Sequence, residues 1–216
     1  MTVRSNTNGF FISFEGGDGA GKSTQIRRLA DHLRQCSHKV VLTREPGGSP
    51  GAEAIRDLLV KGSADRWTPM SEALMMYAAR ADHLARVIKP ALARGDIVIT
   101  DRFADSSMAY QGIAGALGQT SITILHDLVV GEDDPDLTII LDLPVASGLA
   151  RADKRAADES RFESKGLEFQ ESVRQAFLKI ARENPDRCVV IDAAPAPEVV
   201  FRAVADAVEK ALQSRP

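Results

Sequence analysis

The chain has 216 residues, of which 44% are hydrophobic and 26% charged, and its formal net charge at pH 7 is −3. This composition is typical of a globular α/β domain, and the charge argues against electrostatic binding to nucleic acid. No apolar run approaches the roughly 20 residues that cross a bilayer, so we expect a cytoplasmic protein that binds neither nucleic acid nor membrane.

The N-terminus and the cysteines give no sign of export. Residues 1–8 are polar and lack the apolar segment of a signal peptide, so we expect a disordered tail before a single domain over residues 9–216. Cys36 and Cys188 lie far apart in the sequence without a C-x-x-C pattern. This arrangement favours two buried, reduced thiols over a disulfide or a metal site.

Short apolar runs alternate with helical repeats along the chain. The apolar runs predict five strands, at residues 10–14, 39–43, 97–100, 137–141 and 188–191. Helices are predicted at 22–35, 50–61, 70–94 (with Pro90 a kink or boundary), 106–118 in part, 122–130, 145–154, 167–184 and 197–213. The alternation predicts a three-layer fold, a parallel five-stranded sheet with helices on both faces, whose strand carboxyl ends meet at one edge.

The sequence from Gly16 to Ser23 matches G-x-x-x-x-G-K-[ST] in full, between a predicted strand and a predicted helix. This is the P-loop pattern, in which glycines let backbone N–H groups face phosphate oxygens at a helix N-terminus. We expect Lys22 to reach the β- and γ-phosphates of a nucleotide and Ser23 to bind Mg²⁺. The predicted ATP-binding residues are Gly16, Gly17, Asp18, Gly19, Ala20, Gly21, Lys22, Ser23 and Thr24.

Charged residues follow two other strands, at the edge where open α/β sheets bind ligands. Asp101 can hold Mg²⁺ opposite Ser23, and the planar guanidinium of Arg102 can bind a phosphoryl group. Arg44 precedes the turn Glu45-Pro46-Gly47-Gly48, where it can bind an oxyanion. The alternatives are a solvated ion pair at Asp101-Arg102 and an ordinary loop after Arg44.

Other polar residues are weak candidates on their own. Arg56 and Arg80 lie on predicted helices, where most arginines are solvated, while the Gln111 amide can both donate and accept at the edge of a base. Residues 151–165 carry a basic cluster, which is either a solvated helix end or a lid that brings an arginine to a transferring phosphoryl group. The arginines of this cluster are Arg151, Arg155 and Arg161.

The order of these motifs resembles bacterial thymidylate kinases. The shared motifs are the P-loop with an acidic residue inside it, Thr43-Arg-Glu-Pro-Gly-Gly48, Tyr77-Ala-Ala-Arg80, Asp101-Arg102-Phe103, Ala109-Tyr-Gln-Gly112 and Pro135-Asp-Leu-Thr138. The resemblance covers roughly residues 10–200. It implies a P-loop NTPase-type fold, a homodimer, and transfer of the γ-phosphoryl group of ATP to dTMP with Mg²⁺, giving dTDP and ADP in dTTP synthesis.

The resemblance also implies catalytic residues. Lys22 and Arg102 would neutralise charge on the phosphates. Residues 17–20 of the P-loop include no arginine or lysine, and the chain is similar to the class whose lid, here residues 151–165, supplies a catalytic arginine. That arginine would be Arg155 or Arg151, with Arg161 a weaker candidate.

The implied dTMP-binding residues are Asp18, Arg44, Arg56, Met76, Arg80, Arg102, Ser107 and Gln111. Asp18 would accept a hydrogen bond from the sugar 3′-hydroxyl, while Arg44 and Arg102, with Arg56 nearby, would bind the phosphate. Arg80 and Gln111, with Ser107 close to them, would contact the thymine ring.

Met76 departs from the family pattern, because it stands where the family usually places an aromatic ring that stacks on thymine. Tyr77, one residue further on, would point about 100° away on the helix. Two other functions stay open: a kinase for a different nucleotide or nucleoside, and a P-loop switch that hydrolyses nucleotide slowly to signal. The absence of an Asn-Lys-x-Asp motif argues against a GTPase switch.

Overall fold

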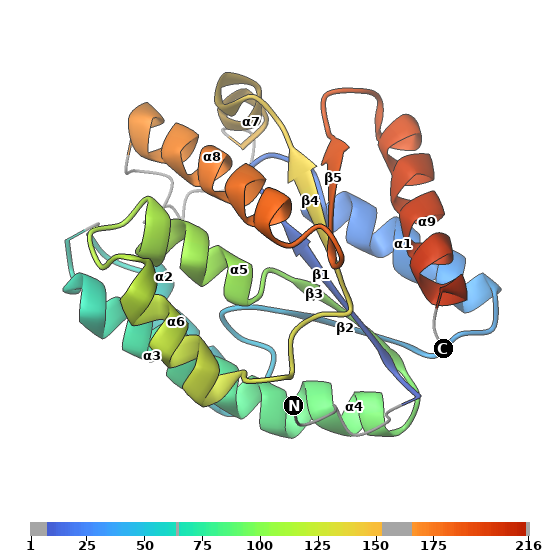
Figure 1. Cartoon of the computed structure of the whole chain (residues 1–216), viewed down its shortest axis with the longest axis horizontal. Helices are drawn as coiled ribbons and strands as arrows, with labels where there is room; N and C mark the ends of the chain where they lie inside the picture. Colours follow the sequence, from blue (N-terminus) through green and yellow to red (C-terminus); the bar gives the residue numbers. More distant parts are fainter. Residues whose placement is uncertain (1–7, 64, 153–165, 215–216) are drawn as a thin grey trace.

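The structure is a computed structural model that describes residues 8–63, 65–152 and 166–214. Its centre is a parallel five-stranded sheet with the order β2-β3-β1-β4-β5 (Figure 1). The strands are β1 (Phe10–Glu15), β2 (Val40–Arg44), β3 (Ile97–Asp101), β4 (Leu137–Asp142) and β5 (Cys188–Asp192). The predicted parallel α/β sheet is confirmed.

Each strand continues one residue beyond the apolar run that predicted it. The added residues are Glu15, Arg44, Asp101, Asp142 and Asp192. A ladder needs only backbone N–H and C=O groups, so it extends past the point where the side chains leave the core. The carboxyl edge of the sheet is therefore lined with charged side chains.

Helices cover both faces of the sheet (Figure 1). They are α1 (Lys22–Gln35), α2 (Pro50–Val60), α3 (Pro69–His83), α4 (Lys89–Ala93), α5 (Ala104–Ser107), α6 (Gln119–Val129), α7 (Val145–Ala152), α8 (Leu167–Glu183) and α9 (Pro197–Gln213), with short π-helical segments η1 (Leu84–Ile88) and η2 (Met108–Ile113). Phe10, Ile12 and Phe14 of β1 pack with α1 and α9, whereas Phe11 packs with α3, α4 and α6. The central strand thus joins the cores on the two faces.

The predicted helix over residues 70–94 is interrupted. The chain forms α3, then the π-helical segment η1, then α4 with Pro90 in its first turn. Proline has no N–H to donate to the preceding turn, and the wider turn of η1 directly before it accommodates the missing bond. Pro90 therefore marks a boundary, one of the two outcomes that the sequence allowed.

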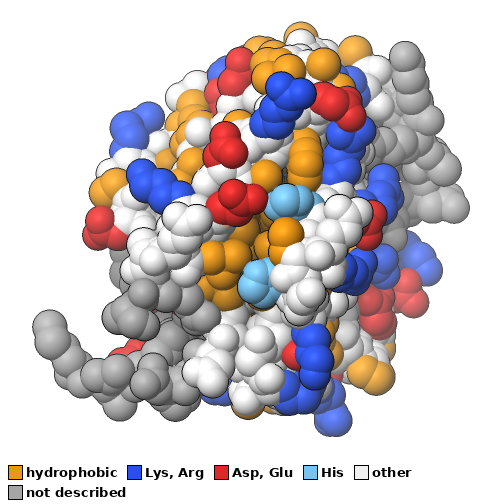
Figure 2. Space-filling view, turned by 90° about the vertical axis from the view of Figure 1, so that its right-hand side faces the viewer, with side chains coloured by type: hydrophobic (Ala, Val, Ile, Leu, Met, Phe, Trp, Pro, Cys, Tyr) orange, Lys and Arg blue, Asp and Glu red, His pale blue; other side chains and the backbone are white. Residues whose placement is uncertain are grey.

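The prediction of two buried thiols is half wrong. Cys188 is buried, but Cys36 is exposed because it caps the C-terminus of α1, and both are free. The face that contains α1 and α9 carries acidic and basic side chains together (Figure 2), and the pairs Arg28–Glu198 and His32–Glu209 link these two helices. Within the described ranges, no helix has the length and apolar character needed to cross a membrane.

Candidate active site

The charged edge of the sheet surrounds a cavity of about 290 Å³. Strand register brings its walls together, since Asp101 in β3 pairs with Phe14 in β1 and with Arg44 in β2. Lys22, Ser23 and Asp101 line the cavity. So do all eight residues that the resemblance links to dTMP, namely Asp18, Arg44, Arg56, Met76, Arg80, Arg102, Ser107 and Gln111.

The P-loop connects β1 to α1 through conformations that favour glycine. Gly19 has a φ of 74°, and a Cβ on it would overlap the carbonyl oxygen of Gly148 in α7. Lys22 is buried, and its Nζ donates to the carbonyl oxygens of Gly16 (3.1 Å) and Gly17 (3.0 Å). Burial lowers the pKa of Lys22. The ammonium group therefore lies inside the loop, where a phosphate can replace carbonyl oxygens as its partner.

Ser23 and Asp101, the predicted Mg²⁺ ligands, are hydrogen-bonded neighbours. Ser23 Oγ donates to Asp101 Oδ2 over 3.3 Å. Hydroxyl and carboxylate oxygens are hard donors, which Mg²⁺ binds together with water and phosphate oxygens. In the part of the chain that the structure describes, no group of three or more His, Cys, Asp or Glu side chains could hold a metal ion. The pair fits a cation bound jointly with a nucleotide.

Arg102 ties the P-loop to the end of β3. Its Nη2 donates to Asp18 Oδ1 (2.7 Å), and its Nη1 donates to the Gly16 carbonyl oxygen and to Ser106 Oγ (both 3.1 Å). Burial alone would raise the pKa of Asp18, but Arg102 and Lys22 hold it below its usual value. Arg102 has a φ of 68°, which is rare outside glycine. Backbone strain at a charged cavity residue is typical of a functional position.

Glu15, the last residue of β1, is linked to Arg102 through the hydroxyl group of Ser106. It was not singled out from the sequence. Its carboxylate is fully buried and accepts hydrogen bonds from the Phe103 N–H (2.8 Å) and from Ser106 Oγ (2.6 Å). Burial, with Asp105 adding to it, raises the pKa of Glu15 to about 7. The only sequence signal was a carboxylate that ends an apolar strand directly before the P-loop.

Two further arginines reach the cavity from β2 and α2. Arg44 pairs with Glu53 Oε2 over 3.1 Å, and its side chain is 54% exposed. Arg56 Nη1 donates to the Pro46 carbonyl oxygen (2.7 Å), and the Glu45–Pro46 peptide bond is cis. With Arg102, these residues give the cavity three guanidinium groups, whose planar forks match the oxygens of a phosphate.

Arg80, Ser107 and Gln111 form the part of the wall that the resemblance assigns to a base. Arg80 Nη2 donates to Ser107 Oγ (3.1 Å). Gln111 Nε2 donates to the buried carboxylate of Glu72 (2.7 Å). Since a carboxylate accepts only from the amino end of the amide, this bond fixes the orientation of the amide, and its carbonyl oxygen can accept from a ligand.

Met76 and Tyr77 point in different directions, as predicted. Met76 lines the cavity, whereas Tyr77 is buried, with its ring centroid 4.6 Å from the Arg80 guanidinium carbon. Methionine sulfur is polarisable and packs on ring faces. Met76 therefore adds an apolar surface to the cavity wall, and Tyr77 packs against Arg80.

A second cavity, of about 380 Å³, lies beside the P-loop and contains Arg151. Its wall includes Gly19, Thr24, Gln25 and the loop between β5 and α9. Arg151 belongs to α7, and its Nη1 and Nη2 donate to the carbonyl oxygens of Ala193 (3.1 Å) and Ala194 (3.3 Å). Arg151 is thus not in the cavity with Arg102, while Arg155, Arg161 and the predicted lid beyond Ala152 lie outside the described residues.

Comparison with known proteins gives the same family that the motifs resemble. The family model for thymidylate kinase matches residues 14–204. A curated thymidylate kinase of Caulobacter vibrioides is 60% identical over 206 residues, which cover 95% of this chain and 99% of that protein. A thymidylate kinase of Dinoroseobacter shibae is 57% identical over 184 residues, with coverage of 85% and 88%. The chain belongs to the thymidylate kinase family.

A solved structure of a thymidylate kinase also has this fold. The crystal structure of the enzyme from Ehrlichia chaffeensis superimposes with a TM-score of 0.76 at 36% identity, and the match covers 93% of this chain and 98% of that chain. The P-loop NTPase-type fold that was expected from the sequence is therefore confirmed.

Two buried residues near the site of this kinase, Glu45 and His83, were not identified from the sequence. Glu45 Oε2 accepts from Arg80 Nε (2.8 Å), and Glu45 Oε1 lies 2.9 Å from His83 Nδ1. His83 Nε2 in turn lies 2.6 Å from Thr43 Oγ1. Glu45 had a signal, because it belongs to the Thr-Arg-Glu-Pro-Gly-Gly motif, but His83 had none beyond a histidine in a helix.

Gly48 makes this arrangement possible, and its substitution is expected to destabilise the fold. Gly48 has a φ of 89°, and a Cβ on it would overlap both His83 Nε2 and Thr43 Oγ1. We expect Gly48→Ala to lower the free energy of unfolding by roughly 1–3 kcal/mol, from backbone strain and displacement of the imidazole. Urea unfolding followed by circular dichroism measures this loss.

Gly131 provides a control for that substitution. It has a φ of 57°, and a Cβ on it would meet only the Asp127 carbonyl oxygen, in ordinary contact at 3.6 Å. Gly131→Ala therefore introduces backbone strain without overlap and should cost less than Gly48→Ala. Equal losses from the two variants would show that contact with His83 and Thr43 is unimportant.

Proposed function

We propose that this chain transfers the γ-phosphoryl group of ATP to dTMP, giving dTDP and ADP. Membership of the thymidylate kinase family supports this reaction. The observation that carries it is one cavity in which the P-loop lysine, Lys22, adjoins a site with three arginines for a phosphate and an amide for a base. A pure ATP-hydrolysing switch has no use for such a second site.

The proposed mechanism is alignment and charge neutralisation. The acceptor phosphate is already a nucleophile, so no general base is required. Lys22 and Arg102 bind phosphate oxygens, where charge spreads over the transferring group in the transition state. Ser23 and Asp101 would hold Mg²⁺, which supplies further positive charge at the phosphates.

On the acceptor side, we assign the dTMP phosphate to Arg44, Arg56 and Arg102. Asp18, with its lowered pKa, stays an acceptor for the sugar 3′-hydroxyl. Arg80 and Gln111, beside Ser107, contact thymine, and Met76 packs against the ring.

On the donor side, the second cavity adjoins the outside of the P-loop at Gly19 and Thr24. We assign the base of ATP to it, with Arg151 as part of its wall. Of the lid arginines expected from the sequence over residues 151–165, we therefore assign the transferring phosphoryl group to Arg155 rather than Arg151.

The test is ADP release with a panel of acceptors: dTMP, dUMP, dCMP, dAMP and thymidine. We expect the highest kcat/KM with dTMP and no turnover of thymidine, because Arg44, Arg56 and Arg102 need a phosphate on the acceptor. Faster turnover of another nucleotide or of thymidine would overturn the assignment. ADP release that no acceptor stimulates would favour the switch.

We also propose a homodimer formed through α2, α3 and α6. Leu58, Leu74, Ile124 and Leu128 on these helices are exposed, with Ile124 62% and Leu128 79% exposed and one turn apart on α6. Exposed apolar side chains on neighbouring helices are typical of an interface between protein surfaces. Cytoplasmic location and the absence of nucleic-acid and membrane partners stay predictions from the sequence.

The dimer is tested by Leu128→Asp, which places a charge in the proposed interface. We expect the molar mass from light scattering to fall to that of one chain, with an unchanged circular dichroism spectrum. Leu167→Asp on α8 is the control, since Leu167 is likewise an exposed leucine (62%, against 79% for Leu128) but lies on another helix. A monomeric wild-type protein, or an equal effect of both variants, would contradict the interface.

A further inference from the structure

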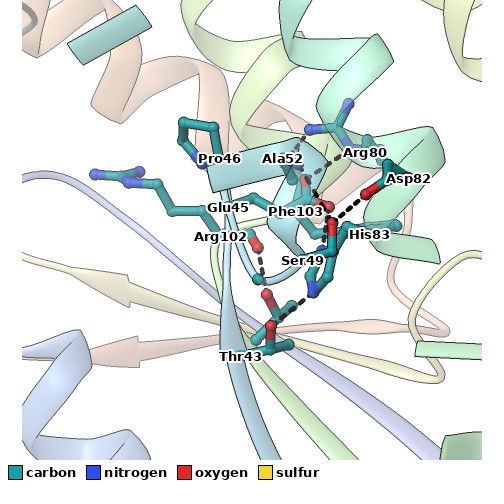
Figure 3. Close-up of polar contacts among 12 residues, drawn as sticks. Thr43, Glu45, Pro46, Ser49, Ala52, Arg80, Asp82, His83, Arg102 and Phe103 are labelled. Carbon is teal, nitrogen blue, oxygen red and sulfur yellow. Dashed lines mark hydrogen bonds and ion pairs between the residues drawn. The ribbon is translucent and has the colours of Figure 1, made fainter. Parts of the chain in front are cut away.

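A buried chain of polar side chains lies behind Arg80 and reaches back to β2 (Figure 3). We infer that Glu45 and His83 are positioning residues that orient Arg80 and thereby set the selectivity of the enzyme for the acceptor base. The inference rests on the proposed function, because it concerns the base part of the same acceptor site.

The Arg80 guanidinium is fixed in orientation, with one end left for a ligand. Its Nε donates to Glu45 Oε2 (2.8 Å), and its Nη2 donates to the Phe103 carbonyl oxygen (3.2 Å) and to Ser107 Oγ (3.1 Å). These bonds occupy three of its five N–H groups. Nη1 is buried and has no hydrogen-bond partner among the residues that the structure describes. Since Arg80 lines the cavity, this unused donor favours a ligand with an acceptor atom.

Two aromatic rings restrict the same guanidinium. The Arg80 guanidinium carbon lies 4.6 Å from the ring centroid of Tyr77 and 5.2 Å from that of Phe103. Stacking fixes the plane of a guanidinium, whereas hydrogen bonds fix its rotation within the plane. Burial would lower the pKa of Arg80, but Glu45 raises it above its usual value. Arg80 therefore keeps its positive charge, and the orientation of its guanidinium group depends on the hydrogen bond to Glu45.

Glu45 is itself held by His83. The side chains of Glu45 and His83 are 5% and 0% exposed, so an unpaired carboxylate oxygen would be costly here. An ionised carboxylate only accepts, so His83 Nδ1 donates to Oε1 (2.9 Å). Whether His83 Nε2 accepts from or donates to Thr43 Oγ1 (2.6 Å), this hydrogen bond fixes the imidazole. The order of support is therefore Thr43, His83, Glu45 and Arg80.

Base chemistry converts the orientation of Arg80 into selectivity. Thymine presents the O4 acceptor where cytosine presents an N4 amino donor. A donor fixed at Nη1 stabilises thymine, through O4, and disfavours cytosine, whose N4 is also a donor. An arginine that can turn would discriminate less between the two bases. Loss of Glu45 or His83 should therefore reduce the preference for dTMP over dCMP, beyond any general loss of activity.

The experiment compares kcat/KM for dTMP and dCMP in wild-type protein and in Glu45→Gln. Arg80 and His83 donate to different oxygens of Glu45, and an amide has an acceptor oxygen at only one of these two positions. We expect the dTMP/dCMP ratio to fall at least about tenfold, or 1.4 kcal/mol, with a higher KM for dTMP and a kcat within about threefold of wild type. A purely structural role would lower kcat/KM for both acceptors by one factor and leave the ratio unchanged, which would overturn the inference.

Two His83 variants and a control complete the test. His83→Asn keeps an N–H donor at the position of Nδ1 for Glu45 and should keep the ratio within about threefold, whereas His83→Leu removes it and should reduce the ratio about tenfold. Equal ratios for these two would overturn the inference, even if Glu45→Gln does not fold. Asp82→Asn is the matched carboxylate-to-amide control, because Asp82 accepts from Ser49 (2.6 Å) and Arg86 rather than from Arg80. It should leave the ratio at the wild-type value.

The outcomes separate the inference from the proposed function. A wild-type protein without preference for dTMP over dCMP would remove the base assignment and the inference together. A wild-type preference that survives in Glu45→Gln and His83→Leu would remove the inference alone.

Discussion

Replacement of Lys22 by alanine is expected to lower kcat by a factor of about 10³ or more, while the protein remains folded. Lys22 Nζ has only two carbonyl oxygens of the P-loop as hydrogen-bond partners among the described residues, Gly16 and Gly17. Those bonds hold the ammonium within reach of the positions that β- and γ-phosphate oxygens would occupy. Removal of one preorganised hydrogen-bond donor typically lowers kcat 10²–10³-fold, and loss of a full positive charge beside a transferring phosphoryl group should exceed that range.

The same substitution should cost the fold little. Burial of the Lys22 ammonium is unfavourable because the charged group loses contact with water, and the same burial lowers its pKa. Alanine leaves Gly16 and Gly17 with carbonyl oxygens that water in the cavity can reach. We therefore expect a melting temperature within a few degrees of wild type, measured beside single-turnover ADP formation. Lys210→Ala, at an exposed position of α9, should leave both quantities unchanged. A Lys22→Ala protein that keeps wild-type turnover would refute the proposed mechanism.

Local sequence pattern was sufficient for the sheet and for the position of the P-loop. Apolar runs predicted all five strands because parallel strands are buried on both faces, and α1 and α9 have the predicted bounds. The π-helical segment Leu84–Ile88 could not be predicted, because its wider turn has no distinct spacing of apolar residues. The position of Cys36 just past α1 was predictable, but its exposure depends on what packs against that end of the helix, which the sequence does not indicate.

The cavity was predictable in many of its members and not in its internal pairing. Strand ends identified Arg44, Asp101 and Arg102, since parallel topology brings strand ends to one edge. The family resemblance supplied the lining residues that lie on helices, and Glu45 was missed.

The Asp18–Arg102 pair joins residues 84 positions apart, and the Glu45–His83 pair joins residues 38 apart. Such pairs depend on how loops and helices pack, and no single-sequence pattern indicates them. Arg151 shows the same limit, because its partners are carbonyl oxygens of a loop some 40 residues further along the chain.

Replacement of Arg102 by lysine is expected to lower kcat/KM for dTMP by roughly 10²–10³-fold. Lysine keeps the charge, but one ammonium cannot reach the Gly16 carbonyl oxygen, Ser106 Oγ and Asp18 Oδ1 in the geometry of a planar fork. The φ of 68° at this position is equally unfavourable for lysine and arginine, so backbone strain cancels in the comparison. Steady-state kinetics with dTMP, beside a thermal melt that reports folding, measures the effect.

The Asp18–Arg102 pair gives this prediction a second, sharper form. Suppose that Asp18 contacts the sugar and Arg102 the phosphate. Asp18→Asn should then lower kcat/KM for dTMP but not for its 3′-deoxy analogue, which has no hydroxyl for the carboxylate to bind. Arg102→Lys should lower kcat/KM for both acceptors by the same factor, because both carry the phosphate. If Arg102 acts only by holding Asp18, the analogue should be insensitive to both substitutions, and the double variant should be no worse than either single one. Separate losses would show that the two residues, paired at 2.7 Å in the structure, part to bind different groups of one acceptor.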